Sequence, residues 1–327
     1  MRRWLLALAV VAAVSLGAVA LTGSSPLAAA AAALDGAFGS MLAVQETLAK
    51  SVPLLWCGLA VALAFRAGVW NIGAEGQLLV GAVAATGAGL LLPAGWWSLV
   101  ATLAAGGIAG GLWAAIAAAL RRLSGVDEVL STILLNLVAL PVVGWAVHGP
   151  LQAPGGSLPQ SALLPQQAWL WRPFPPGRLH LGCLLVGLAV AALWVALRRS
   201  GWGLDLRATG EGWAAARACG VPVARVQAQA LVLSGVLAGL GGAVELAGIT
   251  HRLFERFSPG YGYSGIAVAL LGGLEPGGTA LAALLFGAMA AGSGGMQRSA
   301  GVPAVVTLLV QGLVVVALAV RRGDDRG

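Results

Sequence analysis

Charged residues are scarce in this sequence. Asp, Glu, Lys and Arg make up 9% of its 327 residues, aromatic residues make up 6%, and Lys50 is the single lysine. Soluble domains contain about 25% charged residues, so this composition excludes an ordinary soluble enzyme. What is present instead is 59% hydrophobic residues, arranged in repeated apolar runs long enough to span a bilayer. We therefore expect an all-α, polytopic membrane protein.

Residues that hold metals or carry out catalysis are few and scattered. The three cysteines and three histidines show no metal-ligand spacing: Cys57, Cys183, Cys219, His148, His180 and His251. No Gly-x-x-x-x-Gly-Lys-Ser/Thr loop is present, so this chain cannot itself hydrolyse ATP. A protease function, suggested by the glycine-flanked Ser264, lacks a histidine base inside any predicted span. We expect no metal, no cofactor and no enzymatic activity.

Hydropathy divides the chain into about ten transmembrane segments. They are residues 4–22, 47–65, 77–92, 96–120, a span ending near 148, 179–197, 228–249, the short 263–274, 279–297 and 302–320. A cleaved signal peptide is the alternative for the first segment. Residues 26–46 are expected outside the spans, partly as an interfacial helix. We predict one transmembrane domain with two loosely repeated halves, 4–148 and 179–322, joined by a proline-rich external loop at 149–178.

The distribution of basic residues predicts the orientation. With the spans placed as above, thirteen of the 19 basic residues fall on the side of both termini, and five fall on the opposite side. Cytoplasmic loops carry the excess of Lys and Arg, so both termini are expected in the cytoplasm. The same distribution explains the net charge of +7 without a nucleic-acid partner.

The stretch Phe65–Gln77 interrupts the apolar sequence with an asparagine, a glutamate, a glutamine and three glycines. Such a segment is tolerated at membrane depth only where it packs in protein or lines a wet cavity. It predicts a broken helix beside a solute path. A second interruption at Gly272–Gly278 carries Glu275 where the first carries Glu75. Interruptions in corresponding positions of two halves are typical of transporter binding sites.

Further polar residues lie inside the predicted spans. Thr132 and Asn136 are four residues apart and share a helix face, which either joins helices or lines a cavity. Glu245 could snorkel to the interface, pair with His251 or Arg252, or face a vestibule. The predicted path residues are Asn71, Glu75, Gln77, Ser131, Thr132, Asn136 and Glu245. Close helix packing is predicted at a glycine-dense face: Gly235, Gly239, Gly241 and Gly242.

The longest polar stretch after a span is the cytosolic loop 198–227. Residues 211–219 favour a short helix that ends at Gly220 and the following proline. A short isolated helix cannot bury its surface alone, so it either docks on a partner or lies on the lipid surface.

Several of these motifs occur together, in the same order, in one family of transport proteins. The sequence resembles the permease subunits of bacterial ATP-binding-cassette (ABC) importers, in the branched-chain amino acid and ribose-type branch, and most closely the nucleoside permeases. The resemblance covers nearly the whole chain and is carried by Asn71–Gln77, Gly125–Thr132, Gly210–Gly220, Pro259–Gly272, Met296-Gln297 and Gly301–Pro303.

This resemblance implies a location in the bacterial inner membrane and a set of partners. They are a cytosolic ABC ATPase, a second homologous permease and an extracytoplasmic solute-binding lipoprotein. The residues that would dock into the ATPase are Gly210, Glu211, Ala214, Ala215, Ala216, Gly220 and Pro222.

The implied solute is a small polar molecule, most closely a nucleoside. A sugar or a branched-chain amino acid is the alternative within the family, and a secondary transporter using Glu75 or Glu245 as proton carrier is the alternative outside it. Glu275 departs from the nucleoside permeases, which usually have a basic or polar residue and a histidine before the proline.

Overall fold

A computed structural model describes residues 13–14, 17–21, 23–93, 95–156 and 158–303, with 306, 309, 312 and 313. Within this part the regular elements are helices and no β-sheet forms. The long helices are α3 (Met41–Arg66), α4 (Ala74–Leu91), α5 (Ser98–Ser124), α6 (Glu128–His148), α7 (Gly182–Arg199), α10 (Val223–Glu245) and α12 (Pro276–Ala300). The shorter ones are α2 (Pro26–Phe38), α8 (Gly201–Glu211), α9 (Trp213–Ala218) and α11 (Tyr261–Leu271).

Seven helices of the described part are long and apolar enough to cross a membrane, counting α10 with its continuation to Thr250. They coincide with the predicted internal spans, so the prediction of an all-helical polytopic protein is confirmed. The predicted short segment is α11, whose 11 residues extend only about 16 Å, half of the roughly 30 Å hydrocarbon core. The first and last predicted spans, 4–22 and 302–320, lie largely outside the described residues.

Helix α3 begins before the predicted span. That span was predicted over residues 47–65, but α3 begins at Met41, where the Ser40 hydroxyl caps it by accepting the Ala43 N–H at 3.1 Å. Gln45 and Thr47 are buried in this first part, with 5% and 4% exposure. Hydropathy misses these turns because they carry polar side chains that the fold buries.

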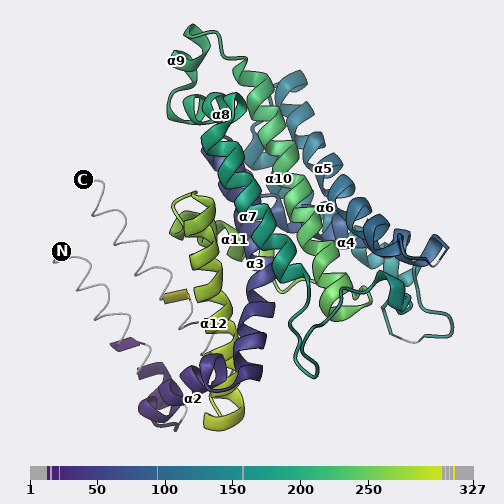
Figure 1. The fold of residues 1–327 in the computed structure, drawn as a ribbon, viewed down its shortest axis with the longest axis vertical. Coiled ribbons are helices and arrows are strands. Elements are labelled where there is room, and N and C mark those ends of the chain that lie inside the picture. The colour runs from purple at the N-terminus through teal and green to yellow at the C-terminus, as the bar shows by residue number, and fades with distance from the viewer. Residues whose placement is uncertain are drawn as a thin grey trace.

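Glycines bring the central helices into backbone contact. A β-carbon on Gly110 of α5 would collide with the carbonyl oxygen of Gly235 on α10, and one on Gly239 would collide with that of Gly106. A β-carbon on Gly81 of α4 would collide with the backbone of Gly239 on α10. Figure 1 shows α5 and α10 running side by side. The glycine-dense face predicted for α10 is therefore confirmed as a packing surface.

The loop between α6 and α7 covers the end of the molecule opposite α8 and α9 (Figure 1). Among the described residues of this loop, 149–156 and 158–181, the one regular element is a 3-10 turn at Gln166–Ala168. Trp169 stacks on His251, with ring centroids 3.9 Å apart, and Arg172 donates to the Gly248 carbonyl at 2.8 Å. The loop is thereby fixed to the π-helical turn Leu246–Thr250 that ends α10.

Two buried histidines lie where this loop meets the end of α10: His180 belongs to the loop and His251 follows the π-helical turn. They predict that the stability of the protein depends on pH. Burial, with the nearby charge of Arg172, lowers the pKa of both His180 and His251 from 6.5 to about 4. Because the unfolded chain takes up these protons first, the stabilisation is complete above pH 6.5 and is lost as pH falls towards 4. We expect the melting temperature of the full chain to fall between pH 7 and 5.

The double variant His180→Phe/His251→Phe should lose most of that pH response. His148 is a surface histidine outside the cluster, with 57% side-chain exposure, so His148→Gln serves as the matched control and should keep the response. An unchanged response in the double variant would contradict the assignment.

Candidate functional site

The interruption between α3 and α4 turns back into the helix bundle. After Arg66 the chain passes through Gly68, whose φ of +70° suits glycine. The side chain of Asn71 then donates to the Ser234 hydroxyl at 2.7 Å, and Ser234 donates to the carbonyl of Ala60 at 2.6 Å. Ala60 lies six residues before Arg66, the last residue of α3. After α3 ends, the chain therefore turns back into the bundle by about 9 Å along the axis of that helix. The predicted broken segment is confirmed as a non-helical turn between the two helices.

Asn71 organises this turn. Its side-chain oxygen Oδ1 accepts the backbone N–H of Gly73 at 2.9 Å and the side-chain amide of Gln77 at 3.1 Å, and its side-chain amide donates to Gln77 Oε1 at 2.9 Å. Asn71 is 0% exposed and Gln77 is 1% exposed. In a low-dielectric interior such paired amides satisfy one another and hold a single backbone conformation.

Helix α6 supplies the other half of the network. Asn136 accepts the Gly76 N–H and donates to the Ile72 carbonyl, both at 2.8 Å, and the Thr132 hydroxyl accepts the Ile72 N–H at 3.3 Å. These bonds satisfy three backbone groups of the interruption that lack helical partners. The predicted 132/136 face therefore joins α6 to the broken segment.

Ser131 behaves differently from its neighbours. Its hydroxyl donates to the Glu128 carbonyl of its own helix at 3.2 Å and does not reach the interruption. The Glu128 carboxylate does reach it, by accepting the Trp70 N–H at 3.4 Å, and it also pairs with Arg121 at 3.3 Å.

Glu75 joins the first interruption to the N-terminus of α11. Its carboxylate accepts the Gly262 N–H at 2.6 Å, and a β-carbon on Gly262 would collide with the Glu75 backbone nitrogen. The Ser258 hydroxyl accepts the backbone N–H groups of Gly260 and Tyr261, the two residues preceding Gly262, both at 3.1 Å. A carboxylate at this position complements the helix dipole, so two helix N-termini meet at one acidic side chain.

Glu245 lies apart from this network, towards the loop end of α10. It is 6% exposed and lines a cavity of about 70 Å³. His251 does not pair with it, because His251 contacts Arg172 at 2.9 Å. The same cavity is lined also by Glu46, Lys50, Arg178, Ile249 and Tyr261.

The family model for the permease component of branched-chain amino acid transport systems matches residues 43–319. The chain belongs to this family. It is 36% identical to the glucose ABC transporter permease of Haloferax volcanii, over 95% of this chain and 85% of that protein. It is also 36% identical to the guanosine ABC transporter permease of Bacillus subtilis, over 87% and 83%. No solved structure gives a significant match.

A further relative of the permease is the nucleoside ABC transporter permease of Lactococcus lactis, which is 29% identical over 87% of this chain and 81% of that protein. Together with the seven apolar helices, these matches support a multi-pass membrane protein, and they agree with the resemblance stated from the motifs.

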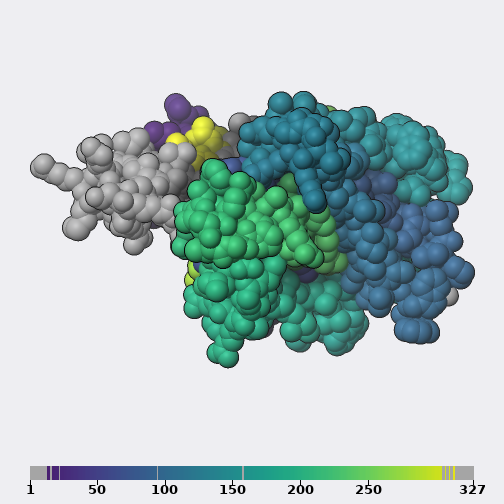
Figure 2. All heavy atoms as spheres, turned by 90° about the horizontal axis from the view of Figure 1, so that it is seen from above, coloured from purple at the N-terminus to yellow at the C-terminus, as the bar shows by residue number. Residues whose placement is uncertain are grey.

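The predicted coupling segment of the permease lies at the end of the molecule opposite the α6–α7 loop, and Figure 2 looks onto this face. The short helix predicted over 211–219 is present as α9, and Gly220 beyond it has φ +87°. Ala216 is buried, whereas these residues are exposed: Glu211, Ala214, Ala215, Gly220 and Pro222. Helix α8 was not predicted, because its 11 residues include three glycines and little apolar periodicity.

Gly210, at the end of α8, touches the first interruption directly. A β-carbon on Gly210 would collide with the carbonyl oxygen of Arg66, the last residue of α3. The predicted coupling segment and the broken segment are therefore in backbone contact.

Arg66 also connects the first interruption to the second. Its guanidinium donates to the Glu275 carboxylate at 2.7 Å and to the Leu274 carbonyl at 3.1 Å, while Arg198 lies 3.6 Å from the same carboxylate. Burial opposes ionisation of Glu275, but the hydrogen bond and charges of Arg66 and Arg198 outweigh it and lower its pKa. The glutamate that departs from the nucleoside permeases thus has two basic partners.

Three members of the network were missing from the predicted site: Ser234, Arg66 and Glu128. Ser234 was visible as a hydroxyl in a span of Gly, Ala, Leu and Val, and that is the signal that could have identified it. Arg66 adjoins the interruption, but its partner Glu275 lies 209 residues away. The site thus joins Asn71, Gln77, Thr132 and Asn136 through Ser234 and backbone groups, with Glu75 beside them.

Proposed function

We propose that this permease forms the translocation path of an ABC importer for a nucleoside. The observation that supports it most is the match to the guanosine permease over 87% of the chain at 36% identity. The polar groups gathered at the interruption also fit an uncharged polar solute, because most of them are amides and hydroxyls. A nucleoside offers hydroxyls and base edges to such groups.

The proposed topology has about ten spans with both termini in the cytoplasm. It divides the single domain into residues 4–148, the external loop 149–178 and residues 179–322, with the coupling loop 198–227 in the cytoplasm. Arginines at the α8–α9 end, among them Arg121, Arg122, Arg198 and Arg199, support this orientation.

The proposed complex contains a cytosolic ABC ATPase, a second homologous permease and an external solute-binding lipoprotein in the inner membrane of a bacterium. The exposed face of α9 supports ATPase docking. Arg217 lies over the Trp213 ring at 5.3 Å, and Trp213 is 57% exposed. An exposed tryptophan with a cation is a typical centre of a protein interface.

Movement of the coupling segment reaches the path through Gly210. Its backbone rests on Arg66, and Arg66 holds Glu275 and the Leu274 carbonyl. Displacement of α9 by the ATPase therefore shifts the ends of both interruptions together. The network around Asn71 transmits this shift to α6 and α10.

The residues proposed to line the path are Asn71, Glu75, Gln77, Ser131, Thr132, Asn136 and Glu245. In the conformation described, the first six are at most 5% exposed, so this conformation is a closed one. Opening of the path would expose them to solute, and Glu245 would face the solute from the outer vestibule.

Competition for uptake tests the solute class. With the complete complex in proteoliposomes, excess unlabelled guanosine is expected to abolish uptake of labelled guanosine, while glucose leaves it unchanged. The equal identity to the glucose permease makes a sugar the second candidate. Uptake of labelled glucose, with no uptake of labelled guanosine, would establish that candidate instead.

Placing a charge on α9 should uncouple the complex. Ala215 is exposed, so Ala215→Asp should leave the chain folded but put a carboxylate in the docking surface. We expect uptake to fall at least tenfold while ATP hydrolysis continues, measured on the same vesicles. Ala215→Ser is the matched control without charge. Normal uptake by Ala215→Asp would argue against docking through α9.

A further inference from the structure

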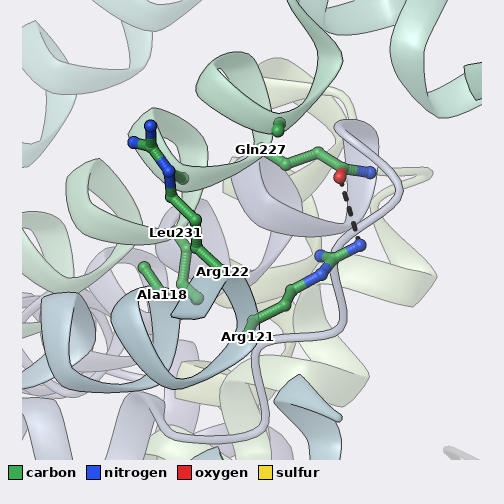
Figure 3. A pocket seen from close by; sticks show the side chains of 7 residues that line it. Ala118, Arg121, Arg122, Gln227 and Leu231 are labelled. Carbon is green, nitrogen blue, oxygen red and sulfur yellow. Dashed lines mark hydrogen bonds between the residues drawn. The ribbon is translucent and has the colours of Figure 1, made fainter. Parts of the chain in front are cut away.

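A cavity of about 230 Å³ opens between the ends of α5 and α10 that lie near α8 (Figure 3). One water molecule needs only about 10–15 Å³ of such space, so a phosphate group fits easily. Residues of α5 and α10 line the cavity, among them Ala118, Arg121, Arg122, Ala224, Gln227 and Leu231.

The cavity forms where the close packing of α5 and α10 ends. Up to Ala118, small residues hold the two backbones together, as at Gly110 against Gly235. From Leu120 on, α5 continues with leucine and arginine, whose side chains cannot enter such a contact. The helices separate there and leave a space with a basic rim.

One of the two arginines is held by protein and the other is free to bind a ligand. Arg121 donates to the Gln227 side chain at 3.1 Å, drawn in Figure 3, and lies 3.3 Å from the Glu128 carboxylate. Arg122 is exposed and has no hydrogen bond or ion pair among the described residues. The cavity therefore carries an excess of one positive charge.

A row of exposed apolar side chains runs along α5 up to the level of this cavity. The row consists of Leu112, Ile116, Leu120 and Leu123, with exposed fractions of 64%, 41%, 37% and 82%. Spacings of four, four and three residues place them on one face of the helix, with Ala118 and Arg121 on the opposite face and Arg122 between the two. An acyl chain lying against the apolar face would bring its headgroup to the level of Arg122, whose side chain lies between that face and the cavity.

We propose that this cavity binds the phosphate of an anionic phospholipid headgroup, with Arg122 as its principal ligand. Basic pockets between transmembrane helices on the cytoplasmic side are suited to such headgroups. The inference rests on the cytoplasmic orientation proposed above for this end of the molecule.

The cavity is connected to the interruption between α3 and α4. Gln227 donates to the Ala67 carbonyl at 3.5 Å, and Glu128 accepts the Trp70 N–H at 3.4 Å. Arg121 links these two side chains. A bound headgroup therefore stabilises the start of the broken segment through residues that already hold it.

Native mass spectrometry of the purified full chain tests the site with phosphatidylglycerol, phosphatidylcholine and inorganic phosphate as probes. Each basic side chain near a lipid surface contributes about 1 kcal/mol, which corresponds to about fivefold in affinity. We expect Arg122→Ala to weaken phosphatidylglycerol binding about fivefold. Arg199 is an exposed arginine in the last turn of α7, at the same end of the molecule as Arg122. Arg199→Ala is therefore the matched control and should retain binding within twofold.

Equal binding by the wild type and Arg122→Ala would overturn the proposal, as would an equal loss in Arg199→Ala or equal binding of phosphatidylcholine. Inorganic phosphate that displaces phosphatidylglycerol at equal concentration would identify a free phosphate as the ligand and overturn the lipid assignment. This assay contains no solute and no ATPase. If the proposed guanosine transport failed its own test, the result of the lipid-binding assay would not change, so the two failures can be told apart.

Discussion

Replacing Asn136 by leucine is expected to abolish solute uptake and to lower the free energy of unfolding by about 2–6 kcal/mol. The side chain satisfies the Gly76 N–H and the Ile72 carbonyl, both at 2.8 Å, and it is 2% exposed. Leucine has similar volume but would leave both backbone groups buried without partners, at about 1–3 kcal/mol each. Uptake by the assembled complex and denaturant unfolding of the permease measure the two effects.

Ser131 offers a matched control five residues earlier on α6. Its hydroxyl is buried, but it bonds only to a carbonyl of its own helix. Ser131→Ala should therefore change the free energy of unfolding by less than about 1 kcal/mol. If Asn136→Leu lowered stability no more than Ser131→Ala does, the network would not hold the broken segment.

Replacing Gly210 by alanine is expected to uncouple ATP hydrolysis from transport. The added methyl group would collide with the Arg66 carbonyl oxygen, and the end of α8 must move away from α3 to make room. We expect uptake to fall at least tenfold, with the complex still assembled and hydrolysing ATP. Uptake and phosphate release from the same vesicles give the coupling ratio.

Gly201, at the other end of α8, is the control for helix propensity. A β-carbon on Gly201 meets nothing within 4 Å, so Gly201→Ala should leave the coupling ratio unchanged. A normal ratio in Gly210→Ala would show that the contact with Arg66 does not transmit movement.

The spans could be predicted from the sequence because bilayer thickness determines the length of an apolar helix. The breaks could also be predicted, because the polar stretch Phe65–Gln77 and the short α11 fit no continuous span. Hydropathy failed where fold contacts decide the structure. Polar residues at the start of α3 are buried by tertiary packing. Helix α8 buries Leu206 and packs its end on Arg66, and hydropathy carries no signal for either contact.

The partners within the site could not be predicted from one sequence. Asn71 and Ser234 are separated by 163 residues, and Arg66 and Glu275 by 209, so only the packing of the helices brings them together. Glu75 and Glu275 each lie in one of the two predicted interruptions, but their contacts differ. Glu75 binds the N-terminus of α11, whereas Glu275 pairs with arginines at the α8 end.

The energy source is the most direct test of the proposed importer. In proteoliposomes containing the complete complex, uptake of labelled guanosine is measured with ATP inside, with and without a proton uncoupler, and with an ATPase subunit that cannot hydrolyse ATP. Uptake that survives the uncoupler and stops with the inactive ATPase is the predicted result. Uptake that follows the proton gradient and ignores the ATPase would contradict the proposal and identify a secondary transporter.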